Sequence, residues 1–347
     1  MKAARFYTGR DIRVEEIPDP KPASGQVLVR VRAAGICGSD LHTYRRGTLL
    51  FPERAPLILG HELAGEVLAL GQGVADLKVG QRVAVEPLIG CGSCPACTSG
   101  DYHLCPQLAH IGNFYPGGFA EMVVAPRGKV FPLPDSVEMD AAGILDVYAC
   151  AVHALHRVPV AVNDSVLVMG GGAIGLTTAQ AVRAAGARRL FVMATHPRAA
   201  RVAREIGAES VINPRETDPV AAVMALTDGK GVDVAIEAVG GSANTLEVAL
   251  QVAARGGRVG ALGSFPNPVS LPVNSGLRRE LSLNWIWSYA MWKGVPEFKI
   301  ALDLVAEGRV DPKPLITHAF PLGEIEAAFQ SALDKKTSDS IKVMIHP

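Results

Sequence analysis

The chain lacks several features that would point to particular classes of protein. Lysine and arginine together number 34, and so do aspartate and glutamate, so no excess charge favours nucleic acid or a membrane surface as a partner. No apolar run reaches the ~20 residues that a membrane-spanning helix needs. The first residues enter a strand-like segment without the apolar core of a signal peptide, which favours a cytoplasmic protein.

Cysteine is scarce, and its distribution is uneven. Four of the six cysteines lie within one short stretch, and the other two are Cys37 and Cys150. Disulfide frameworks are typical of small secreted chains, whereas tight clustering in a chain of 347 residues indicates a metal. The spacing C-x2-C-x2-C-x7-C can close a tetrahedron around Zn²⁺ without an open position. We therefore predict a structural zinc site at Cys91, Cys94, Cys97 and Cys105.

The pattern of apolar residues changes near residue 150, and 347 residues exceed one ordinary core. Before that point, short strand candidates bounded by Gly and Pro predict a partly open antiparallel barrel; they are residues 26–32, 65–70 and 80–85. After it, apolar strands alternate with alanine-rich helical stretches, which predicts a parallel doubly wound sheet. The strand candidates there are 166–169, 190–193, 211–212, 234–237, 259–262 and 281–284.

The tail, with a helix at 296–307 and a strand at 340–345, is expected to fold back onto the first domain. The predicted organisation is therefore a β-rich domain over 1–150, a nucleotide-binding domain over 151–289, and a return to the first domain over 290–347.

A glycine motif follows the first apolar strand of the second domain. The sequence Gly170-Gly171-Gly172-Ala173-Ile174-Gly175 reads G-x-G-x-x-G and leads into a helical stretch. In such motifs the first glycine permits a tight turn, the second lets the backbone approach a pyrophosphate, and the third allows close packing of helix and strand. The helix N-terminus then offers unpaired N–H groups to the phosphates. The motif predicts a dinucleotide site.

The end of the next strand bears on which dinucleotide is bound. NAD-preferring sites carry an acidic residue ~20 residues beyond the glycines, which binds the ribose 2′-hydroxyl. Here that place is Ala194, and Thr195 and His196 after it could donate hydrogen bonds to a phosphate. Arg198 or Arg201 could pair with the same phosphate. We predict a preference for NADP(H); the alternative is that both arginines are solvated and either cofactor serves.

A second set of metal-binding residue types is dispersed along the first domain. It comprises Cys37, the pair His61-Glu62, and Asp146. A catalytic zinc takes about three protein ligands and keeps one position open. That open position allows the metal to act as a Lewis acid on a carbonyl oxygen.

Taken together, these motifs resemble the zinc-containing medium-chain alcohol dehydrogenase family over essentially the whole chain. The resemblance is carried by Gly35–Asp40, Gly60–Glu62, the four-cysteine lobe, the glycine motif and the closing strand. It implies a Rossmann sheet inserted in a GroES-like catalytic domain. It also implies that Cys37 and His61 bind the catalytic zinc, that Glu62 binds it or lies just behind it, and that Asp146 is a fourth or water-bridged ligand.

The same resemblance implies a proton relay. Ser39 and His42 stand where family members pass the alcohol proton to solvent through the cofactor ribose. The chemistry agrees, since a hydroxyl can pass a proton and histidine titrates near neutral pH. The alternative is that His42 is an ordinary surface residue.

Substrate identity is less clear from the sequence. The polyol, sugar-alcohol and threonine dehydrogenases are the most similar subgroups, and residues 279–289 align with a segment of the sorbitol branch. Ser288 replaces an arginine of that branch, and Trp285 and Ile286 stand where small residues are expected. Trp285 could line a pocket or pack at a dimer edge, and we expect the dimer edge. Family members are dimers or tetramers, so a homodimer or homotetramer is expected.

The predicted function is zinc-dependent hydride transfer between NADP(H) and a secondary alcohol or ketone, with a polyol, sugar alcohol or related hydroxy compound as substrate. One alternative is an L-threonine-type amino-alcohol dehydrogenase using NAD, which Asp146 favours and Ala194 disfavours. Another is a non-catalytic dinucleotide-binding sensor or structural protein. The retained set of Cys37, His61, Glu62 and Asp146 argues against that reading.

Overall fold

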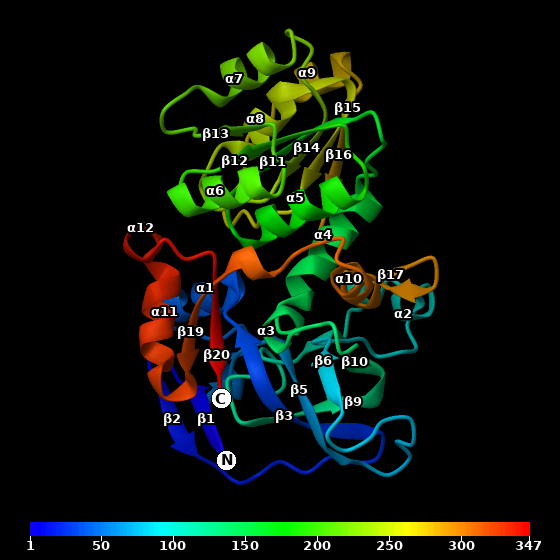
Figure 1. Cartoon of the computed structure of the whole chain (residues 1–347), viewed down its shortest axis with the longest axis vertical. Helices are drawn as coiled ribbons and strands as arrows, with labels where there is room; N and C mark the ends of the chain where they lie inside the picture. Colours follow the sequence, from blue (N-terminus) through cyan, green and yellow to red (C-terminus); the bar gives the residue numbers. More distant parts are fainter. The chain divides into compact units, whose positions relative to one another are not determined.

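The computed structural model describes residues 1–347, and the chain divides into two compact units. The first unit comprises Met1–Asp146, Ala290–Gly308 and Pro312–Pro347. The second comprises Val147–Tyr289 and Arg309–Asp311. Both termini belong to the first unit, and the second is an insertion in its chain (Figure 1).

A seven-stranded sheet forms the frame of the first unit. Its strands follow the order β10-β6-β5-β3-β20-β19, and β9 also pairs with β3. Its pairs are antiparallel, as predicted for the first part of the chain, except that β19 and β20 of the tail pair in parallel. The strands are β3 (Gln26–Gly35), β5 (Glu62–Leu70), β6 (Arg82–Val85), β9 (Met122–Pro126), β10 (Val130–Pro132), β19 (Ile316–Pro321) and β20 (Lys342–His346).

The alternation of side chains along β3 explains why this segment is a central strand. Val27, Val29 and Val31 are buried, while Arg30 and Arg32 between and beyond them are exposed. Successive side chains of a strand point to opposite faces, so one face contributes to the core. A smaller sheet packs beside it in the order β2-β1-β4, with β1 (Lys2–Phe6), β2 (Ile12–Glu16) and β4 (Leu57–Ile58).

The remaining elements of the first unit are short. Two-stranded ribbons form from β7 (Leu88–Ile89) with β8 (Ala109–His110) and from β17 (Met291–Trp292) with β18 (Val295–Pro296). The helices are α1 (Gly38–Arg46), α2 (Pro95–Thr98), α3 (Met139–Ala142), α10 (Glu297–Ala306), α11 (Ile325–Leu333) and α12 (Lys335–Ser338). Single 3₁₀ turns lie at Pro52–Arg54, Tyr102–Leu104, Arg127–Lys129, Lys313–Leu315 and Leu322–Glu324.

The second unit contains a six-stranded parallel sheet in the order β13-β12-β11-β14-β15-β16. In sequence order this is 3-2-1-4-5-6, the arrangement of a doubly wound dinucleotide-binding fold, which confirms the predicted sheet. Its strands are β11 (Ser165–Met169), β12 (Arg189–Met193), β13 (Ser210–Ile212), β14 (Val232–Glu237), β15 (Ala253–Ala261) and β16 (Ser282–Trp285).

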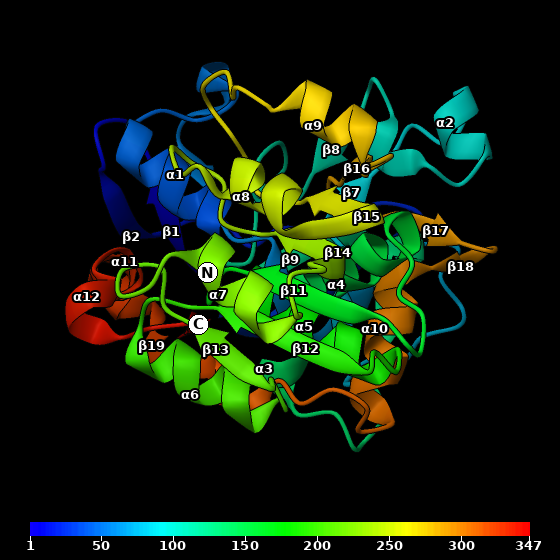
Figure 2. The ribbon, with the colours of Figure 1, turned by 90° about the horizontal axis from the view of Figure 1, so that it is seen from above.

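Helices cover both faces of this sheet. Figure 2 shows α5 (Ala173–Ala184) and α6 (Pro197–Glu205) on one side, and α8 (Thr245–Val252) and α9 (Val273–Arg278) on the other. The two remaining helices are α4 (Leu145–Arg157) and α7 (Pro219–Leu226). Strands buried on both faces are continuous apolar runs, as in Val166–Met169, where every residue is fully buried.

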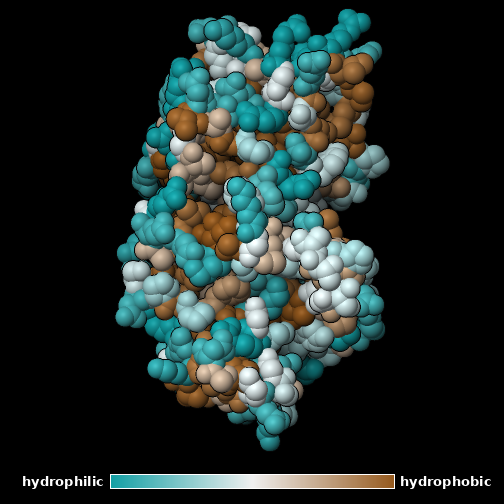
Figure 3. Space-filling view, turned by 90° about the vertical axis from the view of Figure 1, so that its right-hand side faces the viewer, coloured by the Kyte–Doolittle hydropathy of each residue, from teal (hydrophilic) through white to brown (hydrophobic).

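The surface drawn in Figure 3 is largely hydrophilic, with hydrophobic side chains gathered in separate patches. Five large hydrophobic side chains of the second unit are more than half exposed, and they are Val162, Val273, Leu277, Trp285 and Trp287. No helix of the structure is both long enough and apolar enough to cross a membrane.

Candidate active site and metal centres

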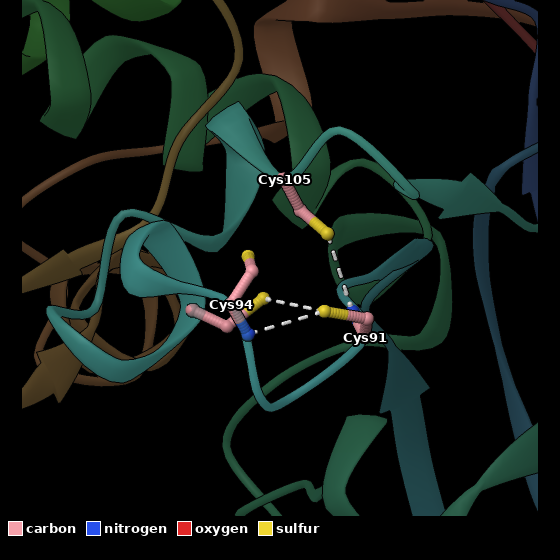
Figure 4. Close-up of side chains that lie close together, drawn as sticks. Cys91, Cys94 and Cys105 are labelled. Carbon is pink, nitrogen blue, oxygen red and sulfur yellow. Dashed lines mark hydrogen bonds between the residues drawn. The ribbon is translucent and has the colours of Figure 1, made fainter.

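The four clustered cysteines converge in a lobe between β7 and β8. Their sulfur atoms all lie within 4.8 Å of one another, and the Sγ atoms of Cys91 and Cys97 are 3.9 Å apart. A tetrahedron with Zn–S bonds of ~2.3 Å requires sulfur separations of about 3.8 Å. Figure 4 shows the sulfur atoms turned toward a common centre. The structure brings all four predicted ligands together, in a geometry that fits a closed zinc site.

The electrostatics of the lobe also favour a cation. Backbone N–H groups of Ser93 and Cys94 lower the pKa of Cys91 to about 6. Burial, together with contacts with the neighbouring thiols, raises the pKa of Cys97 to about 11. The Cys91 and Cys97 thiols therefore do not ionise together. A divalent cation at their centre would remove this conflict, because each thiolate would then have a positive neighbour.

The dispersed candidate ligands also meet, at the ends of two neighbouring strands of the first unit. Cys37 follows β3 as the N-cap of α1, and His61 and Glu62 stand at the start of β5. The ligand atoms of these three residues lie within 4.8 Å of one another. Gly60 precedes them with φ +89°, and a Cβ on it would lie 2.7 Å from the Phe119 ring, so this turn requires glycine.

Negative charge is concentrated around His61. Burial lowers the pKa of His61, but the charges of Cys37 and Asp40 raise it more, so the net shift is upward. Thiolate, imidazole and carboxylate are the donors that zinc accepts. The residues present therefore fit a zinc ion, which would replace the proton as the compensating charge.

Asp40 belongs to this site, although the sequence analysis did not single it out. Its Oδ2 accepts a hydrogen bond from the Cys37 backbone N–H at 2.9 Å, and its Oδ1 lies 3.7 Å from Nδ1 of His61. A carboxylate behind a metal-binding imidazole fixes the orientation of the ring. Its position three residues after the N-cap of a helix is a capping-box signal that the sequence does contain.

Asp146 lies near Cys37, His61 and Glu62, but it is not one of the residues whose ligand atoms all lie within 4.8 Å of one another. It is buried in the first turn of α4. Its charge raises the pKa values of both His61 and Lys342, so the carboxylate lies near these two residues. Its role as a fourth or water-bridged ligand stays a prediction.

The two predicted relay residues lie on α1, directly after Cys37. Ser39 and His42 are both exposed. Partial burial and the positive charges of Arg45 and Arg46 lower the pKa of His42. His42 is therefore neutral at pH 7 and able to accept a proton, which the relay requires.

The glycine loop of the second unit shows which glycines the protein itself needs. Gly170 has φ +126°, and a Cβ on Gly175 would lie 1.9 Å from the Gly170 carbonyl oxygen. Gly172 is different, because a Cβ there would meet nothing within 4 Å. Gly172 is the N-cap of α5, whose first residues are Ala173 and Ile174. The space beside it matches the predicted approach of a pyrophosphate to the helix N-terminus.

A polar groove lies at the carboxyl ends of β12 and β13. It is lined by Ala194, Thr195 and His196, the residues that are predicted from the sequence to lie at the ribose site. Arg198 does not line it, and Arg201 pairs with Glu205 at 3.6 Å instead. Most of the other lining residues are polar or small; those used below are Arg204, Asn213 and Glu216.

Arg204, which was not among the predicted site residues, is the arginine that lines the groove. His196, Ala200 and Arg204 are spaced by four residues, so they share one face of α6. This spacing is present in the sequence, whereas Arg198 is nearer to Ala194 along the chain but does not line the groove.

Comparison with known proteins identifies the family. The model of the alcohol dehydrogenase GroES-like domain matches residues 23–135, and that of the zinc-binding dehydrogenase matches 173–307. The chain is 35% identical to sorbitol dehydrogenase of Bacillus subtilis over 349 residues, covering 100% of this chain and 97% of that protein. The chain belongs to the zinc-containing medium-chain alcohol dehydrogenase family. It is also 36% identical to L-threonine 3-dehydrogenase of Pyrococcus furiosus over 325 residues, covering 93% and 92% of the two chains.

A solved structure agrees with this family. A zinc-binding dehydrogenase from Sinorhizobium meliloti 1021, bound to NADP, matches with a TM-score of 0.90 and 32% identity, covering 100% of this chain and 99% of that one. The predicted Rossmann sheet inserted in a GroES-like domain is therefore confirmed. So is the prediction of an enzyme of the zinc-dependent, nicotinamide-using dehydrogenase type.

Proposed function

We propose that this dehydrogenase transfers hydride between NADP(H) and a secondary alcohol or ketone, with a polyol, sugar alcohol or related hydroxy compound as substrate. The observation that carries the cofactor preference is the end of β12, where Ala194 stands in place of a carboxylate. Thr195, His196 and Arg204 face the same groove. Glu216 is the one carboxylate of the lining, and it accepts a hydrogen bond from the Asn213 amide.

In this proposal, the second unit binds the dinucleotide. The N-terminus of α5 and the space beside Gly172 hold the pyrophosphate. The groove beside Ala194 holds the adenosine ribose, and Arg204 with His196 binds the 2′-phosphate. Arg198 is half-buried and does not line the groove. Arg204 therefore binds the phosphate that Arg198 was predicted to bind.

The first unit supplies two zinc sites in the proposal. Cys91, Cys94, Cys97 and Cys105 hold a structural ion. Cys37, His61, Glu62 and Asp146 provide the catalytic site, in which Asp40 orients the His61 imidazole. Zinc bound there supplies a Lewis acid that polarises the oxygen of the substrate.

The protein's own residues would then handle the proton. Ser39 and His42 lie on the exposed side of α1, in the first and second turns after its Cys37 N-cap. Ser39 passes the hydroxyl proton of the substrate toward solvent, and neutral His42 accepts it. In the reverse direction, the same pair returns a proton to the product oxygen.

We also propose a homodimer or homotetramer that forms through the second unit. β16 is an edge strand of its sheet, so one side of its backbone has no partner strand. Trp285 on this strand is 63% exposed, and Trp287 just beyond it is 57% exposed. Exposed tryptophans beside an open edge fit a contact between copies of the chain.

A spectrophotometric substrate panel on the zinc-loaded enzyme tests the proposal. It compares polyols, sugar phosphates, L-threonine and simple secondary alcohols, each with NAD⁺ and with NADP⁺. Faster turnover of a polyol or sugar alcohol with NADP⁺ supports it. Turnover of L-threonine with NAD⁺ instead supports the amino-alcohol alternative, which the similarity to L-threonine 3-dehydrogenase of Pyrococcus furiosus and the position of Asp146 favour.

A further inference from the structure

Lys342 forms a buried ion pair with Glu62. Its Nζ lies 2.7 Å from Oε1 and 2.6 Å from Oε2 of the carboxylate. The two side chains are 3% and 0% exposed. The same ammonium donates to the carbonyl oxygen of Ile36 at 3.1 Å, and Ile36 directly precedes Cys37. The three N–H donors of the lysine therefore have three acceptors, all of them beside the candidate metal ligands.

The strand register explains how a residue near the C-terminus reaches this place. On β3, Gly35 pairs with Met344 of β20 on one side and with Glu62 of β5 on the other. The lysine side chain thus meets Glu62 across the end of β3. A Cβ on Gly35 would lie 2.2 Å from Oε2 of Glu62. Glycine is required there, because any larger residue would displace the carboxylate from the position in which Lys342 binds it.

The ion pair limits what Glu62 can do toward a metal. Both oxygens of the carboxylate are bound to one ammonium, and charge-assisted contacts of this kind are strong in a site closed to water. A metal held by Cys37 and His61 would have to compete with Lys342 for the same oxygens. We propose that Lys342 is a positioning residue that holds Glu62 behind the metal, so that Glu62 balances charge without filling a coordination position. This inference rests on the proposed catalytic metal site.

Lys342→Met tests the inference, because methionine keeps a long side chain and removes the charge. Cobalt(II) replaces zinc, and its visible spectrum reports the ligands. The difference between each protein and the same protein carrying Cys37→Ala isolates the catalytic site from the cysteine lobe. Without its cation, Glu62 should turn to the metal. We expect a changed ligand-field band and an apparent cobalt affinity at least about tenfold higher, since residues just behind a metal alter affinity by ~10–100-fold.

Two further proteins serve as controls. Lys129→Met removes the cation of another ion pair in the same unit, in which the half-buried Lys129 lies 2.7 Å from the buried Glu86. Its cobalt spectrum and affinity at the Cys37 site should match those of the unchanged enzyme. The double variant Lys342→Met with Glu62→Gln removes the carboxylate charge as well, and its spectrum should return toward that of the unchanged enzyme.

The inference is overturned if Lys342→Met binds cobalt with the spectrum and affinity of Lys129→Met. Should Lys342→Met fail to fold, Glu62→Gln decides, because it keeps the shape of the side chain and removes the charge that Lys342 binds. A cobalt spectrum in Glu62→Gln with the unchanged ligand-field pattern supports the inference, and the loss of a ligand from that spectrum refutes it. Cobalt that fails to bind at the Cys37 site of the unchanged enzyme would refute the proposed metal site itself, which separates the two failures.

Discussion

Replacing Arg204 with alanine should weaken the binding of NADP(H) and leave NAD(H) nearly unaffected. Arg204 lines the groove beside Ala194, where the 2′-phosphate is proposed to bind, and NAD(H) has no phosphate at that position. A hydrogen bond to a charged group contributes about 1.5–3 kcal/mol, and exposed ion pairs contribute about 0.2–1 kcal/mol. Arg204 is exposed, so an intermediate value of about 1–2 kcal/mol applies. The dissociation constant of NADPH should rise about 5- to 30-fold.

Arg201→Ala is the matched control for this experiment. Arg201 lies one turn earlier on the same helix, but it pairs with Glu205 and does not line the groove. Fluorescence titrations with NADPH and NADH measure both cofactors on both variants. The reasoning is refuted if the two variants weaken NADPH binding equally, or if Arg204→Ala weakens NADH binding as much as NADPH binding.

Three other measurements test the remaining assignments. Ala194→Asp adds an acceptor for a ribose 2′-hydroxyl and repels a 2′-phosphate, so the ratio of kcat/KM with NADP⁺ to that with NAD⁺ should fall at least about tenfold; an unchanged ratio would place the ribose elsewhere. Cys97→Ser should lower zinc content from two ions to one per chain and lower the Tm by several degrees, because a structural zinc contributes directly to folding free energy. Full metal content, seen by elemental analysis, would contradict the lobe assignment. Replacing both Arg45 and Arg46 with alanine removes charges that lower the pKa of His42. Because His42 accepts a proton only when neutral, the acidic limb of the kcat/KM profile should move to higher pH; a limb that stays in place would mean that another group sets it.

The sequence predicts much of this fold because its apolar pattern is regular. The run Val166–Met169 is apolar throughout, as a strand buried on both faces must be, and the structure contains β11 there. The parallel pairing of β19 with β20 was not predicted. β20 lies between β3 and β19 in the sheet. No local pattern in the sequence shows which strands lie beside β20 or in which direction they run.

In the candidate sites, too, features that are local in the sequence could be predicted, and features that depend on distant segments could not. The four cysteines fall within fifteen residues, so their spacing alone indicates a common metal. Lys342 and Glu62 are separated by 280 positions in the chain, and a lysine in a strand ordinarily reads as an exposed residue. Only the register of β20 against β3 shows that this lysine is buried, so the pair could not be predicted from the residues themselves.

The position of β20 also affects how the enzyme is made. A ribosome releases the last strand only after the whole nucleotide-binding unit has been synthesised, and domains generally fold as they emerge. β20 pairs with β3, which is synthesised some three hundred residues earlier, so closure of the first sheet is a late, long-range event. A nascent or prematurely terminated chain that lacks β20 would therefore retain all the candidate zinc ligands without the strand that orders them. Nucleotide binding can mature before the metal site, because the catalytic centre is not complete until β20 has been synthesised.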